Sequence, residues 1–132
     1  MPADAASLVG RTAELGRLVG HVERPDAALM VVLGEGGIGK TRLVDELVAR
    51  AAPTHLVVRG RADEHETTPF GLWHGPSDQL GLARPRADDT TPIAELRWDV
   101  VDGLTSGLSA AGSTLLVLED IQWADDDSLW VL

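Results

Sequence analysis

The chain has 132 residues, of which 44% are hydrophobic and 24% charged, and its formal net charge is −10. This composition is typical of a single globular domain, and the absence of cysteine excludes disulfides and thiolate metal sites and fits a cytoplasmic protein. The acidic balance argues against direct contact with nucleic acid, and no apolar stretch is long enough to span a bilayer.

The first part of the chain is expected to form a helix, a strand and a second helix. Apolar residues recur on one face of residues 12–22, which predicts a helix there. The apolar run 28–33 has the length of a parallel strand that is buried on both faces. Helical spacing resumes from Thr41, and Pro53 is expected to stop that helix.

Residues 34–41 match the phosphate-binding loop pattern G-x-x-x-x-G-K-[ST]. Bare glycines let successive amide N–H groups surround phosphate oxygens, and the following helix directs its positive dipole end toward them. Lys40 is the only lysine in the chain, and its flexible ammonium is expected to reach the β- and γ-phosphates. The Thr41 hydroxyl is expected to bind Mg²⁺. The predicted nucleotide-binding residues of this loop are Gly34, Glu35, Gly36, Gly37, Ile38, Gly39, Lys40 and Thr41.

The middle of the chain adds a second strand and two helices. Residues 55–59 are a predicted strand that Gly60 is expected to end. Residues 70–80 favour a helix, which Gly75-Pro76 would bend or break. A longer helix is expected after Thr91-Pro92, because a capping hydroxyl is followed there by a proline in the first turn.

The last predicted strand, residues 115–120, consists of four apolar residues followed by Glu119 and Asp120. In open α/β sheets, ligands bind at the carboxyl ends of the strands. One carboxylate is therefore expected to hold Mg²⁺, and the other to polarise the water that attacks the γ-phosphate. By position Glu119 is the better metal ligand and Asp120 the better base, although the two roles can be exchanged. Residues 126–132 begin a further predicted helix, and the alternation of strands and helices predicts a parallel α/β sheet.

Four segments carry a family resemblance: LVGR at 8–11, GEGGIGKTRLV at 34–44, GRA at 60–62 with TPFG at 68–71, and LEDIQWAD at 118–125. In this order they resemble the signalling ATPases called STAND, in the AAA+-like group. Within that group they are most similar to the ATPase domain of LuxR-type (MalT-like, or LAL) bacterial regulators. Two positions depart from the family pattern, Ile121 and Gln122, the second where the family usually has His.

The resemblance implies an α/β P-loop NTPase that acts as a switch. ADP would hold a closed form, ATP with an inducer would open it and promote self-association, and hydrolysis would reset it. The Walker A segment would be residues 34–41 and the Walker B segment residues 115–120. The resemblance adds Arg42 to the nucleotide-binding residues and places three more near the adenine, Val9, Gly10 and Arg11.

The family pattern also predicts what lies beyond these segments. A further strand with a γ-phosphate sensor, a later arginine and a winged-helix region are expected after residue 132. Residues 1–132 are thus expected to be the N-terminal part of an ATPase domain, with an incomplete sheet, weak nucleotide binding and poor turnover by themselves.

Several functions are compatible with these residues. The leading hypothesis is the ATP-binding switch of a LuxR-type transcriptional regulator whose DNA-binding domain lies further along the chain. The alternatives are an ATPase module attached to a nucleotide cyclase or protein kinase, and a non-catalytic remnant or interaction module. A replication initiator of the origin-recognition type is a more distant alternative.

Overall fold

The computed structural model describes residues 12–24, 38–65 and 68–132. The chain forms two compact units, Met1–His55 and Leu56–Leu132. The predicted strand at 28–33 and most of the phosphate loop lie outside the described residues.

The first unit contains two helices that contact each other, α2 (Thr12–Val22) and α3 (Ile38–Ala51). The bounds of α2 agree with the prediction. The expectation that the second helix begins at Thr41 was wrong, because the last residues of the loop motif already have helical backbone. Buried leucines recur at helical spacing in both helices: Leu15, Leu18, Leu43 and Leu47.

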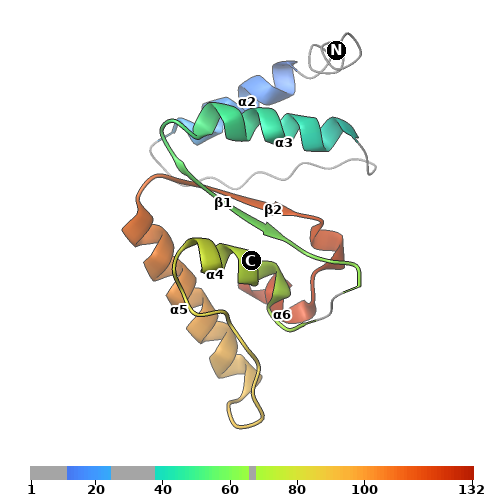
Figure 1. Ribbon diagram of the computed structural model, residues 1–132, viewed down its shortest axis with the longest axis vertical. Helices are drawn as coiled ribbons and strands as arrows, with labels where there is room; N and C mark the ends of the chain where they lie inside the picture. The colour runs from blue at the N-terminus through green and yellow to red at the C-terminus, as the bar shows by residue number, and fades with distance from the viewer. Residues whose placement is uncertain (1–11, 25–37, 66–67) are drawn as a thin grey trace. The chain divides into compact units, whose positions relative to one another are not determined.

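The second unit is built on two paired strands, β1 (Leu56–Arg61) and β2 (Thr114–Glu119) (Figure 1). The strands are parallel, in a continuous register that runs from Leu56 opposite Thr114 to Arg61 opposite Glu119. Parallel strands need a crossover connection, which here contains helices. The predicted α/β class with a parallel sheet is therefore confirmed.

Gly60 does not end β1, contrary to the prediction, because the strand continues through it to Arg61. A Cβ atom at this position would lie 2.6 Å from the Leu72 carbonyl oxygen and 2.9 Å from both Pro76 Cγ and Leu118 Cδ2. The glycine is therefore required by the close approach of the segment that contains Leu72 and Pro76, and not by a turn.

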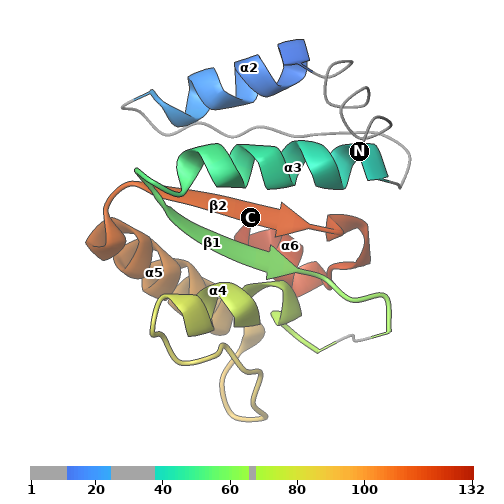
Figure 2. The same cartoon turned by 45° about the horizontal axis from the view of Figure 1, so that its top comes forward.

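The remaining elements of this unit are helical, and α4, α5 and α6 lie on one side of the sheet (Figures 1 and 2). Buried Ala62, Leu72, Trp73 and Leu104 form the core there, with Leu116 and Leu118 of β2 packed against them. The elements are η1 (Gly71–Trp73), α4 (His74–Gln79), α5 (Ile93–Ala111), η2 (Ile121–Trp123) and α6 (Asp126–Val131).

The predicted helix at 70–80 consists of two short pieces, η1 and α4. Phe70 precedes them in the left-handed conformation, with φ 63°. Gly75 and Pro76 lie in the first turn of α4. A proline, which lacks the backbone N–H, is tolerated there because an N–H in the first turn has no acceptor within the helix. Of the two expected effects of Gly75-Pro76, a break or a bend, the break is therefore wrong, because α4 runs through both residues.

The long predicted helix is confirmed as α5, but Thr91 does not cap it. The Thr91 hydroxyl donates instead to Asp88 Oδ2 at 3.2 Å. Hydrogen bonds from the backbone N–H groups of Thr91 and Thr90 hold the pKa of Asp88 below its ordinary value. A turn centred on Asp88 thus leads the chain into α5. None of the helices in the described part of the chain combines the length and apolarity needed to cross a membrane.

The tryptophans occupy different environments. Trp73 is buried in the core of the second unit. Trp98 and Trp130 pack edge to face with their ring centroids 5.3 Å apart, and both remain partly exposed. The guanidinium of Arg97 lies 5.4 Å from the Trp130 ring and also pairs with Asp127 at 2.8 Å. These contacts join α5 to α6.

Replacing Gly60 with alanine is expected to lower the free energy of unfolding of the second unit by about 2 kcal/mol or more, because the added methyl overlaps backbone and ring atoms. The matched control is Gly103→Ala in α5, where an added Cβ meets no atom within 4 Å. That change is expected to leave stability unchanged or raise it by up to about 1 kcal/mol. Urea unfolding followed by circular dichroism distinguishes the two, and a Gly60→Ala protein as stable as the control would contradict this account.

Candidate functional site

The described end of the phosphate loop forms the first turn of α3. Gly39, Lys40 and Thr41 lie in this turn, which contains no acidic side chain. The first N–H groups of a helix have no partner within it, and they add to the positive end of the helix dipole. Thr41 is exposed. These features are suited to an anion.

Gly34, Glu35, Gly36 and Gly37 lie outside the described residues, and so do residues 9–11. Their roles stay predictions, as do those of Lys40, Thr41 and Arg42.

The two predicted acids lie at the carboxyl end of β2. Glu119 is the last residue of the strand, which therefore ends one residue before the predicted end at Asp120. Asp120 has φ 55° and ψ 37°, a left-handed conformation that aspartate adopts more readily than most residues. The turn at Asp120 leads directly into η2. Glu119 thus has extended backbone at the end of β2, whereas Asp120 has left-handed backbone at the start of the turn.

Each acid is paired with an arginine of β1. Arg61 Nε lies 2.7 Å from Asp120 Oδ2, and Arg59 Nη2 lies 3.3 Å and 3.4 Å from the two carboxylate oxygens of Glu119. The hydrogen bond to Asp120 and the charge of that carboxylate raise the pKa of Arg61 above its ordinary value. Both arginines project from the same face of β1, because alternate residues of a strand share a face.

The sequence reasoning did not identify Arg59 or Arg61 as site residues. The signal that could have found them is the Arg-x-Arg spacing at the end of a strand that pairs with the acid-tipped strand. Spacing alone did not reveal which strand is the neighbour of β2, and so the pairing could not be foreseen.

The donor set of Glu119 and Asp120 fits Mg²⁺. Both side chains present hard carboxylate oxygens, and Mg²⁺ at a nucleotide needs only one or two protein carboxylates, since phosphates and water complete its coordination. Among the described residues, no three His, Cys, Asp or Glu side chains gather around a common point. The two acids suit a metal whose other ligands are phosphate oxygens and water.

Asp125 connects two of the segments that carry the family resemblance, TPFG at 68–71 and LEDIQWAD at 118–125. Its Oδ2 accepts the N–H of Phe70 at 3.0 Å and the N–H of Ser128 at 3.0 Å. Its Oδ1 accepts the Ser128 hydroxyl at 2.6 Å. One carboxylate thus caps α6 and also holds the TPFG segment at 68–71.

Ser128, which the sequence reasoning missed, extends this connection. It is fully buried. Its Oγ accepts the Leu72 N–H at 3.3 Å, and its carbonyl oxygen accepts Trp73 Nε1–H at 3.0 Å. The hydrogen bonds of Asp125 and Ser128 together, here called the Asp125 clamp, satisfy polar groups that burial would otherwise leave unpaired.

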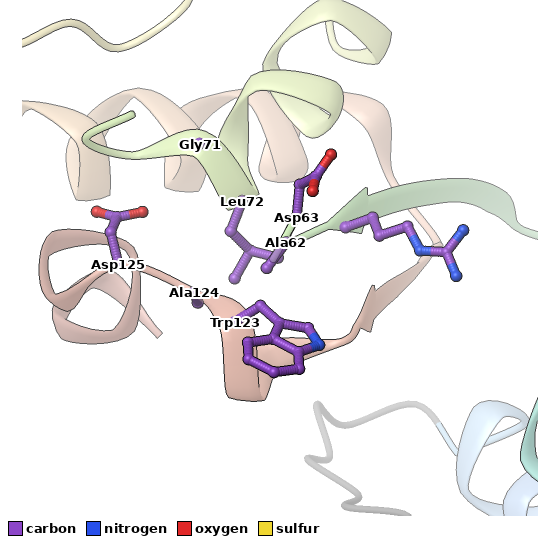
Figure 3. A pocket seen from close by; sticks show the side chains of 8 residues that line it. Ala62, Asp63, Gly71, Leu72, Trp123, Ala124 and Asp125 are labelled. Carbon is purple, nitrogen blue, oxygen red and sulfur yellow. The ribbon is translucent and has the colours of Figure 1, made fainter. Parts of the chain in front are cut away.

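A small cavity lies beside the clamp, lined in part by Ala62, Leu72, Trp123 and Ala124 (Figure 3). Its volume is about 20 Å³, which accommodates a water molecule but not a nucleoside. In Figure 3 the Asp125 carboxylate points away from the Trp123 ring. This cavity is therefore not the place for a base or ribose.

A family model described as an AAA ATPase domain matches residues 7–132. The matched span contains all four segments that carry the resemblance, from LVGR at 8–11 to LEDIQWAD at 118–125. Neither a search among curated proteins nor one among solved structures found a match.

Replacing Asp125 with alanine is expected to lower the free energy of unfolding by about 2 kcal/mol, since a helix cap and a charged acceptor of three hydrogen bonds are lost. Asp126→Ala is the matched control, because Asp126 is exposed and makes none of these bonds; its effect should stay within about 0.5 kcal/mol. Equal losses in the two variants, measured by urea unfolding, would argue against the clamp.

A comparison of the wild-type protein with Asp125→Ala also gives a pH test. Burial raises the pKa of Asp125, but hydrogen bonds from Ser128 and Phe70 outweigh it, and the net pKa lies below the ordinary value. The carboxylate therefore stabilises the fold fully above the ordinary Asp pKa of about 4, and this contribution is lost as the pH falls through the lower folded-state pKa. The stability difference between wild type and Asp125→Ala should be constant above about pH 5 and shrink below about pH 4.

Proposed function

Because the chain belongs to the AAA ATPase domain family, we propose that it binds ATP and acts as the nucleotide-dependent switch of a LuxR-type bacterial transcriptional regulator of the STAND group. The observation that carries the proposal is the phosphate-loop sequence at 34–41, which leads into a helix with no acid in its first turn. The chain uses its only lysine there, at Lys40.

Each part of the loop has a role in this proposal. The backbone N–H groups of residues 34–41 surround the phosphates, and Lys40 neutralises the β- and γ-phosphate oxygens. Arg42 adds positive charge next to the loop. Residues 9–11 contact the adenine, an assignment that rests on the family resemblance alone.

The metal-binding role falls to three oxygen-bearing side chains, Thr41, Glu119 and Asp120. Mg²⁺ bound with the nucleotide would neutralise phosphate charge and favour attack on the γ-phosphate. Of the two acids, one serves the metal and the other orients the attacking water, with Glu119 the first choice for the metal. Hydrolysis is assigned to the full-length protein, and residues 1–132 are proposed as the N-terminal part of its ATPase domain.

The assignment to a transcriptional regulator rests on the order and the amino-acid sequences of the four family segments, above all LEDIQWAD at 118–125. In this reading the protein is cytoplasmic, self-associates through the ATPase domain, and contacts DNA only through another domain. An ATPase module of a nucleotide cyclase or protein kinase and a non-catalytic remnant are the alternatives. The coding sequence beyond codon 132 distinguishes the regulator from the cyclase or kinase module. A helix-turn-helix domain there supports the regulator, and a cyclase or kinase domain contradicts it.

Lys40→Ala is expected to weaken binding of Mg·ATP at least about thirtyfold, because the phosphates lose their charged partner. Isothermal titration calorimetry with Mg·ATP measures the effect. The control is Arg50→Ala, which removes a cation from the last turn of the same helix, where Arg50 forms an exposed pair with Glu46 at 3.4 Å. Binding that is equal in both variants would refute nucleotide binding by the loop.

A further inference from the structure

Both acids at the end of β2 form ion pairs with arginines. The two negative charges of Glu119 and Asp120 are matched by the two positive charges of Arg59 and Arg61 on the neighbouring strand. A metal ion that approaches these two carboxylates therefore meets side chains that are already paired with cations.

The contact between Arg61 and Asp120 is the closer of the two. At 2.7 Å from Nε to Oδ2 it is a charge-assisted hydrogen bond, and it occupies one of the two oxygens that a metal would use. The contact between Arg59 and Glu119 is longer, with both distances above 3.2 Å. Arg61 is therefore the residue that most directly covers a proposed metal ligand.

Arg61 is also the partner that is free to move. Its side chain is 72% exposed, against 36% for Asp120, so most of it is already in contact with water. Asp120 follows the end of β2 and begins the turn into η2, so its backbone is held on both sides. An exchange of partners at Asp120 can thus occur through motion of the exposed arginine side chain.

We propose that Arg61 competes with Mg²⁺ for the carboxylate of Asp120, so that the acids bind free metal poorly and accept it when it arrives with nucleotide phosphates. The inference rests on the proposed function, since it takes Asp120 as a metal ligand. Two cations cannot share one carboxylate without mutual repulsion, so each lowers the affinity of the other. Phosphate oxygens add negative charge and ligands to the metal, and they shift this competition in favour of Mg²⁺.

The test is binding of Mn²⁺, in place of Mg²⁺, to the nucleotide-free protein, followed by the electron paramagnetic resonance signal of the free ion. Arg61→Gln is expected to tighten Mn²⁺ binding by about three- to fivefold, the size expected from losing one exposed ion pair. Arg61→Lys, which keeps the charge, should remain within about twofold of wild type. The gain should shrink at high salt, because salt screens the arginine in the wild-type protein.

The matched control is Arg84→Gln, which removes another exposed arginine of the same unit, paired with Asp78 at 2.6 Å. It should leave Mn²⁺ affinity unchanged. One result would overturn the competition and leave the proposed function intact. In it, Arg61→Gln binds Mn²⁺ no more tightly than wild type, while Asp120→Asn binds Mn²⁺ more weakly than wild type. Mn²⁺ binding that is insensitive to both Glu119→Gln and Asp120→Asn contradicts the metal assignment in the proposed function, and with it this inference. Circular dichroism of each variant verifies that it is folded.

Discussion

The parallel pairing of β1 with β2 is the constraint on which the second unit depends. Its register sets Arg61 opposite Glu119 and Gly60 opposite Leu118. Because neighbouring residues of a strand point to opposite faces, one face of β1 presents arginines to the acids and the other presents a bare glycine to η1 and α4. A slip by one residue would put an arginine against the core and the glycine beside the acids. Core packing and the charge of the site are thus fixed together.

The Asp125 clamp is the second constraint on this unit. It lies at the C-terminal end of the segment that connects β2 to α6. Residues 120–125 begin at the left-handed Asp120 and end at a carboxylate that is bonded to Phe70 and Ser128. Phe70 also has a left-handed backbone, which is uncommon for a large side chain, and the clamp offsets part of the cost of that conformation. The short connection from the acids to α6 is therefore held at both ends, and this favours a defined geometry for Glu119 and Asp120.

Elements with local signals were predictable from the sequence, whereas features that depend on distant neighbours were not. The bounds of α2, the parallel α/β class and the acid-tipped strand followed from periodicity and apolar runs. The role of Gly60 was misread as a strand end, since the approach of Leu72 and Pro76 is a tertiary contact that no local pattern encodes. Thr91 was taken as a cap, but the N-cap position is Pro92, one residue later, and the Thr91 hydroxyl donates to Asp88.

The candidate site was predictable in its residue types and less so in its arrangement. The loop motif and the two acids follow from a pattern of glycines, one lysine and a strand that ends in carboxylates. The arginine partners of the acids and the pairing of Asp125 with Phe70 required knowledge of which segments are neighbours in space. The family match to an AAA ATPase domain supports the chemical reading of the loop, and the roles of its individual residues remain proposals.

The most direct measurement of the central claim is amide hydrogen exchange with and without Mg·ATP, resolved to short peptides. The account predicts that the nucleotide slows exchange in residues 34–41 and also in residues 119–123, because both the loop and the acid-bearing turn take part in binding. Residues 93–111 of α5 serve as the internal reference and should not change. Exchange that is unaffected by Mg·ATP in both segments would contradict the account.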